Sequence, residues 1–444
     1  MKPKVKLLSA FLLLIILLSF ALFPAISISA KSVYELESKS AKRADAIYFY
    51  CYNTKSVLFS KNEEKSIYPA STVKIMTGLI ACERLSLRLD ERMTVTKEML
   101  EGCAGITMGL KAGDVLTVRD IIYCAICGGY NDACQVLAVI CSGSLESFVE
   151  EMNLYAFDLG MNSTVYKNPT GLDQNGACTT ISDIALLSKK AVKNPLYIEI
   201  SSAKNYSYKN ADGKDSVIYN KNALISHFTS NEYLNNYARG LIAGSTEKGG
   251  YVVSTHASYE GMEYLCIVMG AEYDDGTAYS YEIANELING AFAKFTQTKV
   301  ISKGDEISTL SVDCALSTEK EVKVSCVADE DVVAFLPKTA DLKKRIDYHV
   351  FFHEKDLNAP ISAGDVLGGV NVYFDGEFVG TARIISANSV EENAFLVFMK
   401  DARAFFLSRY FIIFICVLIP SLLIVFFVDF KRRRRSRMKR FKFD

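Results

Sequence analysis

Ser71 and Lys74 are the residues of this sequence best placed to perform chemistry together. Their spacing of three puts both side chains on one face of a helix, close enough to interact. A serine hydroxyl is a weak nucleophile unless a base stands beside it. A lysine held in a water-poor site loses its proton more readily and can serve as that base. The pair therefore indicates nucleophilic catalysis at a serine.

The surroundings of Ser71 separate it from other Ser-x-x-Lys sequences of this chain, which begin at Ser201, Ser245, Ser317 and Ser436. Pro69 suits the entry of a helix. Apolar residues then recur at helical spacing, at Ile75, Met76, Leu79 and Ile80. Such a stripe is typical of a buried helix, which we expect over residues 71–86. Ser71 would begin this core helix, whereas a Ser-x-x-Lys sequence that occurs by chance is expected on the solvent-exposed surface.

Both ends of the 444-residue chain carry apolar segments. Residues 1–30 have basic residues, an apolar run and then small residues, which is typical of a secretory signal peptide, a retained membrane anchor being the alternative. Residues 410–428 form a 19-residue apolar run, which as a helix would cross about 28 Å of hydrocarbon. Residues 429–444 hold nine Lys and Arg. By the positive-inside rule this tail is cytoplasmic, so we expect a single-pass protein of the cell membrane with its body outside.

The charge distribution argues against a polyanionic partner. The net charge is −1 although the C-terminal tail is strongly basic, so the body between the two apolar segments is acidic. An acidic body repels nucleic acid, and the basic run at residues 431–442 is typical of the flank of a membrane helix. We therefore expect no nucleic-acid partner.

Histidines and cysteines do not complete a familiar catalytic or metal-binding set. The chain has four histidines and no Gly-x-Ser-x-Gly sequence, so a Ser-His-Asp hydrolase is poorly supported. His349 and His353 lie four apart but in a segment with a strand pattern. Cys124 and Cys127 have metal-ligand spacing without a second pair. We expect buried free thiols, with disulfides as the alternative.

Hydrophobic patterning predicts an α/β or α+β body. The expected elements are two strands over 45–60, helices over 71–86, 117–141, 144–159 and 181–193, and strands over 240–256 and 261–270. Strands at both ends of a run of helices suggest a sheet with helices packed on it. After about residue 295, apolar and polar residues alternate as in strands. We expect a body over residues 31–295, a small all-β domain over 296–392 and a connector over 393–409.

Two further motifs are Gly128-Gly129-Tyr130-Asn131-Asp132-Ala133 and Gly240-Leu241-Ile242-Ala243-Gly244-Ser245-Thr246. Together with the Ser71 motif and the segments Asn168–Asp173 and Asn220–Asn222, they give a resemblance. The chain resembles the D-alanyl-D-alanine carboxypeptidases, which are low-molecular-mass penicillin-binding proteins, from about residue 40 to about residue 390. The resemblance implies a penicillin-binding/β-lactamase-like transpeptidase domain, then a small β-sandwich and one C-terminal transmembrane helix.

The resemblance also implies a reaction. Ser71 would attack the carbonyl between the two D-alanines of a peptidoglycan stem peptide, with Lys74 as general base. Asn131 would hydrogen-bond the substrate amide and Lys74. Gly244 and Ser245 belong to the third motif, and the backbone N–H groups of Ser71 and Ser245 would form the oxyanion hole. β-Lactams would be covalent ligands, and no metal or organic cofactor is implied.

Three positions depart from the family pattern. Gly129 replaces the serine of the second motif, and Ile242 and Ala243 replace the lysine and hydroxyl residue that hold the substrate carboxylate. Neither Arg239 nor Lys248 is an obvious substitute. We expect acylation at Ser71 to survive and turnover to be weakened. The alternatives are a degenerate member that binds cell-wall peptides without cleaving them, and a β-lactamase or endopeptidase, for which no deacylating acidic residue is identified.

Overall fold

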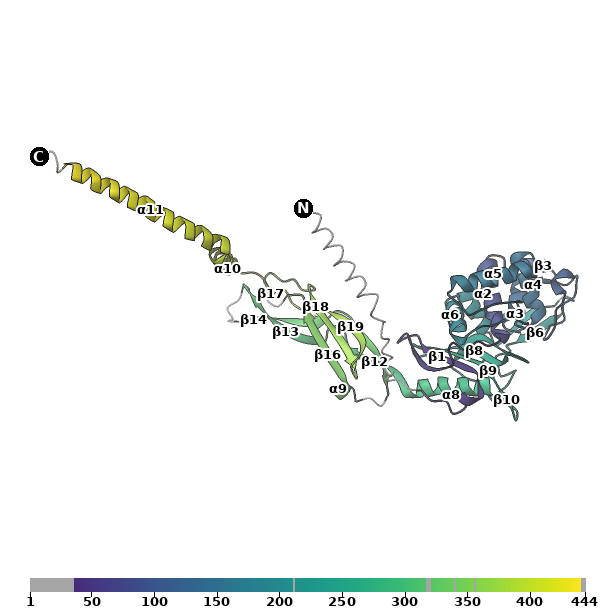
Figure 1. The fold of residues 1–444 in the computed structure, drawn as a ribbon. Helices are drawn as coiled ribbons and strands as arrows, with labels where there is room; N and C mark the ends of the chain where they lie inside the picture. Colours follow the sequence, from purple (N-terminus) through teal and green to yellow (C-terminus); the bar gives the residue numbers. More distant parts are fainter. Residues whose placement is uncertain (1–35, 211, 317–320, 339–340, 355–356, 441–444) are drawn as a thin grey trace. The chain divides into compact units, whose positions relative to one another are not determined.

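The computed structural model describes residues 36–210, 212–316, 321–338, 341–354 and 357–440, so the signal peptide expected over residues 1–30 lies outside it. The chain divides into two compact units (Figure 1). The first comprises Met1–Thr296 with Phe335–Thr339, and the second comprises Gln297–Ala334 with Ala340–Asp444.

An antiparallel sheet forms the centre of the first unit. In spatial order its strands are β2 (Ser56–Lys61), β1 (Ala46–Cys51), β9 (Met262–Ala271), β8 (Gly250–Tyr259) and β7 (Ala238–Thr246). Aromatic and β-branched residues dominate β1, as suits a pleated surface, and β9 is largely apolar. Both faces of the sheet are buried, since Leu265 and Ile267 of β9 lie in one hydrophobic core and Tyr264 and Val268 lie in another. This alternation fixes which side chains of each strand point toward the helices.

Helices cover the two faces of the sheet. One face carries α2 (Val73–Leu85), α3 (Val118–Ile126), α4 (Asn131–Ser142), α5 (Leu145–Asp158), α6 (Ile181–Val192) and α7 (Pro195–Ser202), and the other carries α8 (Tyr279–Lys294). Figure 1 shows α2 and α8 on opposite sides of β8 and β9. Helix α2 is buried along most of its length, as its apolar stripe predicts. The short 3-10 helix η2 (Ala70–Thr72) leads into it and carries Ser71.

The expected single helix over residues 117–141 is wrong, because α3 and α4 are separate helices. Gly129 adopts a positive φ of 67°, which a helix cannot continue through. The backbone N–H of Tyr130 instead donates to Cys124 O, and that of Asn131 donates to Ile106 O at 2.8 Å. The break therefore places Asn131 at the start of a new helix. The expected strand over 240–256 is likewise two strands, β7 and β8, joined by a turn at residues 247–249.

Smaller elements complete the first unit. They are η1 (Ala41–Arg43), η3 (Glu98–Leu100) and three hairpins, formed by β3 (Arg92–Thr94) with β4 (Val115–Thr117), β5 (Asn205–Lys209) with β6 (Asp215–Tyr219), and β10 (Tyr273–Asp274) with β11 (Thr277–Ala278). Strand β6 ends two residues before Lys221, which lies beside the cavity described below.

The C-terminal unit contains the small β-sandwich. A six-stranded sheet has the order β16 (Ile346–Phe352), β18 (Val366–Phe374), β19 (Glu377–Ser386), β14 (Val322–Ala328), β13 (Glu306–Asp313) and β17 (Leu357–Asn358). Strands β12 (Phe295–Ile301) and β15 (Val332–Pro337) contain the unit boundary, and α9 (Leu342–Arg345) precedes β16. The predicted hairpin turn at Asp375-Gly376 is confirmed, because both residues have positive φ between β18 and β19.

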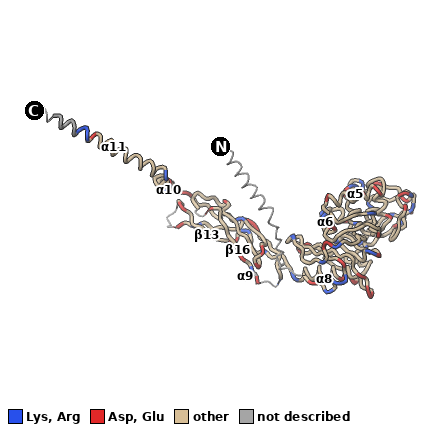
Figure 2. Tube along the Cα trace, in the orientation of Figure 1, with Lys and Arg blue, Asp and Glu red and all other residues tan. Residues whose placement is uncertain are grey.

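Two helices end the chain. The stretch expected as a connector contains α10 (Ala394–Leu407), and α11 (Arg409–Arg440) follows it. In the described part of the chain, one unbroken helix, α11, is long and apolar enough over Arg409–Arg433 to cross a membrane. Its apolar side chains are exposed, as suits a lipid-facing helix. Figure 2 shows its apolar turns followed by basic residues toward the C-terminus.

Candidate active site

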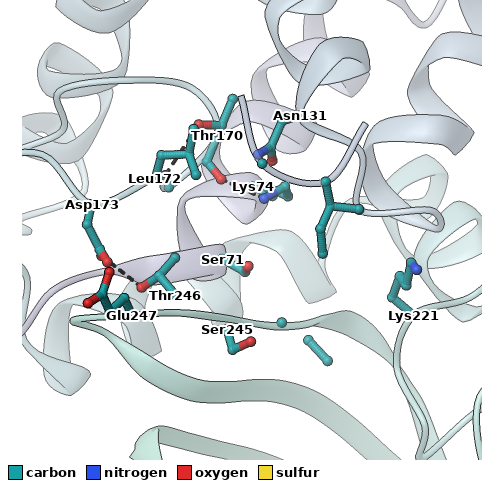
Figure 3. A pocket seen from close by; sticks show the side chains of 16 residues that line it. Ser71, Lys74, Asn131, Thr170, Leu172, Asp173, Lys221, Ser245, Thr246 and Glu247 are labelled. Atoms are coloured by element: carbon teal, nitrogen blue, oxygen red, sulfur yellow. Dashed lines mark hydrogen bonds between the residues drawn. The ribbon is translucent and has the colours of Figure 1, made fainter. Parts of the chain in front are cut away.

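A cavity of about 500 Å³ opens in the first unit, between the start of α2, the start of α4 and the end of β7. Ser71, Lys74 and Asn131 line it, as do Ala243, Gly244 and Ser245 of β7 (Figure 3). The structure therefore brings together residues from three motifs that lie far apart in the sequence. Ile242 does not line the cavity, although the sequence places it in the third motif.

Ser71 lies on the floor of this cavity, one turn before α2. Its side chain is largely buried, with 8% of the residue exposed. The preceding Ala70 adopts a positive φ of 48°, which is uncommon for a residue with a Cβ. This turn presents Ser71 to the cavity at the N-terminal end of a buried helix, where the helix dipole favours a developing negative charge.

Lys74 lies three residues further along, in the first turn of α2, and lines the same cavity. It is buried, with 5% of the residue exposed, and its Nζ donates a hydrogen bond of 2.6 Å to Thr170 O. Burial lowers the pKa of the Lys74 ammonium below its ordinary value of 10.5, while the nearby Cys134 acts weakly in the other direction. A neutral amine that donates to Thr170 keeps its lone pair available to accept a proton.

The loop that holds Lys74 in place is organised by one asparagine. Asn168 Oδ1 accepts hydrogen bonds from the backbone of Thr170 and Gly171, at 3.1 and 2.8 Å, and its Nδ2 donates to Leu172 O at 2.9 Å. These bonds aim the Thr170 carbonyl at Lys74. Sequence reasoning noted this Asn168–Asp173 segment as a family feature but gave it no part in the site.

Asn131 lines the cavity from the start of α4, beside Lys74 and Thr170 (Figure 3). Its Nδ2 donates to Ala104 O at 2.8 Å, and it is buried. The next residue, Asp132, accepts hydrogen bonds from the backbone N–H groups of Gly109 and Leu110. These contacts fix the loop that carries Ile106 against the start of α4. The expected hydrogen bonds from Asn131 to substrate and to Lys74 stay predictions.

Strand β7 passes so close to Ser71 that its third-motif glycine is required. A Cβ on Gly244 would lie 2.3 Å from Ser71 Oγ and 2.8 Å from Ser71 Cβ. Real side chains never approach so closely, so a larger residue here would displace the nucleophile. The next residue, Ser245, also lines the cavity.

The two positions to which the resemblance assigns the substrate carboxylate are apolar and buried here. Ile242 is 2% exposed and packs in the hydrophobic core between the sheet and α2. Ala243 lines the cavity, but its methyl group belongs to the opposite core. Neither side chain can donate a hydrogen bond to an anion.

The two cations considered from sequence as replacements lie elsewhere. Arg239 Nη1 donates to Asn236 O at 3.0 Å and Ala238 O at 2.8 Å, which turns the guanidinium back on its own loop. Lys248 Nζ lies 5.4 Å from the centre of the Tyr68 ring. Neither residue is among those that line the cavity.

Charged residues that sequence reasoning missed stand on two sides of Ser71. Figure 3 shows Lys221 on one side of the cavity and Asp173 with Glu247 on the other. Asp173 accepts hydrogen bonds from Thr246 Oγ1 and from the backbone of Lys248, both at 2.8 Å. The weak sequence signal for Lys221 is its place between two asparagines, in the Asn220–Asn222 segment that carries part of the resemblance.

Comparison with known proteins gives a consistent result. Residues 33–273 match the family model described as D-alanyl-D-alanine carboxypeptidase, and residues 295–392 match that of the penicillin-binding protein 5 C-terminal domain. The chain is 26% identical over 405 residues to D-alanyl-D-alanine carboxypeptidase DacF of Bacillus subtilis, covering 89% of this chain and 97% of that protein. It is 27% identical over 390 residues to DacC of Escherichia coli, covering 84% and 90%.

Solved structures agree with the sequence comparison. The structure of penicillin-binding protein 5 from Haemophilus influenzae matches with a TM-score of 0.55 at 25% identity, covering 79% of this chain and 98% of that one. The structure titled D-alanyl-D-alanine carboxypeptidase DacD from Francisella tularensis has the same fold, with a TM-score of 0.58 at 21% identity, covering 84% and 100%. The expected transpeptidase fold with a C-terminal β-sandwich is thereby confirmed.

Proposed function

This chain belongs to the D-alanyl-D-alanine carboxypeptidase family, and we propose that Ser71, Lys74 and Asn131 carry out its reaction. It is a serine-type carboxypeptidase of peptidoglycan metabolism, which removes the terminal D-alanine from peptides ending in D-Ala-D-Ala. The substrate is the peptidoglycan stem peptide, and β-lactams are covalent ligands of the same serine. No cofactor is needed for this chemistry.

The first half of the reaction forms an acyl-enzyme. Lys74 Nζ accepts the hydroxyl proton as Ser71 Oγ attacks the carbonyl carbon of the penultimate D-alanine. The backbone N–H groups of Ser71 and Ser245 stabilise the oxyanion of the tetrahedral intermediate. The intermediate collapses with cleavage of the C–N bond, and Lys74 returns the proton to the leaving amine of D-alanine. An ester between the peptide and Ser71 remains.

The second half releases the shortened peptide. A water molecule enters from the open side of the cavity, gives a proton to Lys74 and attacks the ester carbonyl. The second tetrahedral intermediate breaks the bond to Ser71 Oγ, which takes the proton back from Lys74. Asn131 positions the substrate amide during both halves. Nucleophile and base are thus restored.

The observation that carries this assignment is the burial of Lys74 in the cavity that Ser71 also lines. A lysine with 5% exposure costs stability as a cation, yet within the described residues the hydrogen-bond acceptor of its ammonium is the neutral Thr170 carbonyl. No structural ion pair explains its presence there. A base for Ser71 explains both its position and its lowered pKa. The non-catalytic alternative gives this lysine no role.

The membrane arrangement extends the same proposal. The apolar helix α11 anchors the protein in a membrane. We place the catalytic body outside and the basic residues after Asp429 in the cytoplasm, because the positive-inside rule favours that orientation. A signal peptide over residues 1–30 would start export. The cell-wall substrate then lies on the same side as the cavity.

D-Alanine release by the full-length protein in detergent tests the function. Wild-type protein should release D-alanine from a peptide ending in D-Ala-D-Ala, and Ser71→Ala should release none above background. The far-ultraviolet circular dichroism of both proteins should match. Equal release by the two proteins would overturn Ser71 as the nucleophile, and no release by either would overturn the assigned activity.

A further inference from the structure

We propose that Lys221 binds the C-terminal carboxylate of the substrate, in the role that Ile242 and Ala243 cannot fill. The inference rests on the proposed function, since it assigns a substrate-binding residue within the same reaction. The ligand class is a peptide with a free C-terminal carboxylate, or a β-lactam, which carries an equivalent acid.

The need for this contact comes from the chemistry of β7. A carboxylate that leaves water requires charged or hydrogen-bonding partners, and Ile242 and Ala243 offer neither. Lys74 is committed to proton transfer and donates to Thr170 O. Among the described residues that line the cavity, Lys221 is the other cationic side chain.

The backbone of Lys221 is fixed by its neighbours. Asn220 Nδ2 donates to Ser201 O and Ala203 O, at 2.9 and 2.8 Å, and Asn222 Nδ2 donates to Gly240 O at 3.3 Å. Both asparagines are buried, while Lys221 is exposed. The backbone N–H of Lys221 donates to Cys127 O at 3.0 Å, in the break between α3 and α4. A rigid backbone thus carries a side chain that remains free to meet a ligand.

The Lys221 stem runs past the glycine of the second motif. A Cβ on Gly129 would lie 3.5 Å from Lys221 Cγ, which is ordinary contact distance. The Lys221 ammonium lies 5.8 Å from the centre of the Tyr130 ring, a contact worth about 0.5–1 kcal/mol at an exposed site. The cation therefore stands beside the position where the family places a serine, two residues from Asn131. No salt bridge of the described residues involves it, so its donors are available.

The charges across the cavity give the peptide a direction. Asp173 and Glu247 line the side opposite Lys221, with Ser71 between them (Figure 3). Like charges repel and opposite charges attract across such a distance, even when partly screened. A peptide lying over Ser71 therefore directs its carboxylate toward Lys221 and its amino-terminal part toward the acidic side. The leaving D-alanine occupies the Lys221 side.

Binding to full-length protein in detergent tests the role of Lys221. In a Ser71→Ala background, calorimetry would measure the affinity for an N-acetylated D-Ala-D-Ala peptide and for the same peptide ending in a carboxamide. Adding Lys221→Met should weaken binding of the free acid about ten- to a hundredfold, as expected for a lost charged hydrogen bond. The carboxamide peptide should bind within about twofold of its original affinity. Adding Lys221→Arg should retain most of the selectivity.

Lys248→Met is the matched control, because Lys248 is a nearby lysine that does not line the cavity. It should leave both affinities unchanged. Equal losses for acid and carboxamide, or no loss for either, would overturn the proposal. So would a Ser71→Ala protein with intact Lys221 that binds the acid no more tightly than the carboxamide. Failure of the wild-type protein to release D-alanine would overturn the proposed function instead. The affinities of the acid and carboxamide peptides would still show whether Lys221 binds the carboxylate. Thermal unfolding identifies any variant that fails to fold.

Discussion

The two sides of the cavity are built in different ways. On the acylating side, Ser71, Lys74 and Gly244 are held by close packing and buried hydrogen bonds. On the carboxylate side, β7 presents apolar groups, and the nearby cation is the exposed end of Lys221. Proton transfer needs atoms placed at hydrogen-bonding distance, whereas charge attraction declines slowly with distance. A charge can therefore be supplied from another segment more easily than a nucleophile can.

The largest effect should come from removing the base. Lys74→Met should slow acylation of Ser71 by a penicillin about 10²- to 10⁴-fold, since general base catalysis supplies a factor of that size. Stopped-flow measurement with a fluorescent penicillin would give the rate. The variant should keep its fold, because a buried lysine is replaced by an apolar side chain of similar length. A loss below tenfold would show that another group takes the proton.

Crowding the nucleophile should have the next largest effect. Gly244→Ala would put a methyl group 2.3 Å from Ser71 Oγ, so acylation should fall about a hundredfold or more, judged by the 10²-fold cost of a 1 Å misplacement. Gly290→Ala is the control, because its Cβ would meet only Leu36 at 3.8 Å. The control should acylate normally and unfold at the same or a higher temperature. Normal acylation by Gly244→Ala would contradict the observed approach of β7.

The pH dependence should follow Lys74. Below its pKa, the acylation rate should rise about tenfold per pH unit, because only the neutral amine accepts the proton. Burial lowers this pKa from 10.5, so the rate should level off before that pH. A rate that still rises through pH 10.5 would show that Lys74 titrates like an exposed lysine.

The pH dependence of the free energy of unfolding should also reflect the titration of Lys74. The folded-state pKa of Lys74 lies below its unfolded value, so between the two values the unfolded chain binds more protons. The free energy of unfolding therefore increases as the pH rises from the folded-state pKa to the unfolded-state pKa. Lys74→Met lacks this term, so it should be the more stable protein at neutral pH. The difference in melting temperature should shrink toward pH 10.5, and a constant difference would contradict the account.

The smallest effect should come from restoring the family residues on β7. Ile242→Lys with Ala243→Thr should raise D-alanine release less than about tenfold while Lys221 is present, because Lys221 already supplies a charged anchor worth about ten- to a hundredfold. The same pair in a Lys221→Met background should recover a larger factor. No gain in either background would mean that the missing anchor does not limit turnover. Comparing the two gains measures how far Lys221 replaces the motif lysine.

Local patterns predicted the acylating side of the cavity well. Ser71 and Lys74 lie three residues apart, so their proximity follows from helical geometry alone. Strands β1, β2 and β9 and the hairpin at Asp375-Gly376 also follow from local alternation and turn chemistry, whereas the turn between β7 and β8 does not. Separate family motifs then suggested that Asn131 and Gly244 join them, and the structure places all of them around one cavity.

The remaining features depend on tertiary contacts. Lys221 reaches the cavity because buried asparagines bind Ser201, Ala203 and Gly240, and none of these pairings is visible in the sequence. The break before Asn131 is not evident from the pattern, because apolar residues at helical spacing lie on both sides of Gly128 and Gly129. The Thr170 carbonyl was also missed, since backbone acceptors leave no pattern in side-chain types.

The most direct test of the central claim, that Ser71 is an acylating serine, is mass spectrometry of the full-length protein after incubation with a penicillin. One covalent adduct per chain should form, peptide mapping should place it on Ser71, and Ser71→Ala should carry none. A folded wild-type protein without an adduct, or with its adduct on another residue, would contradict the account.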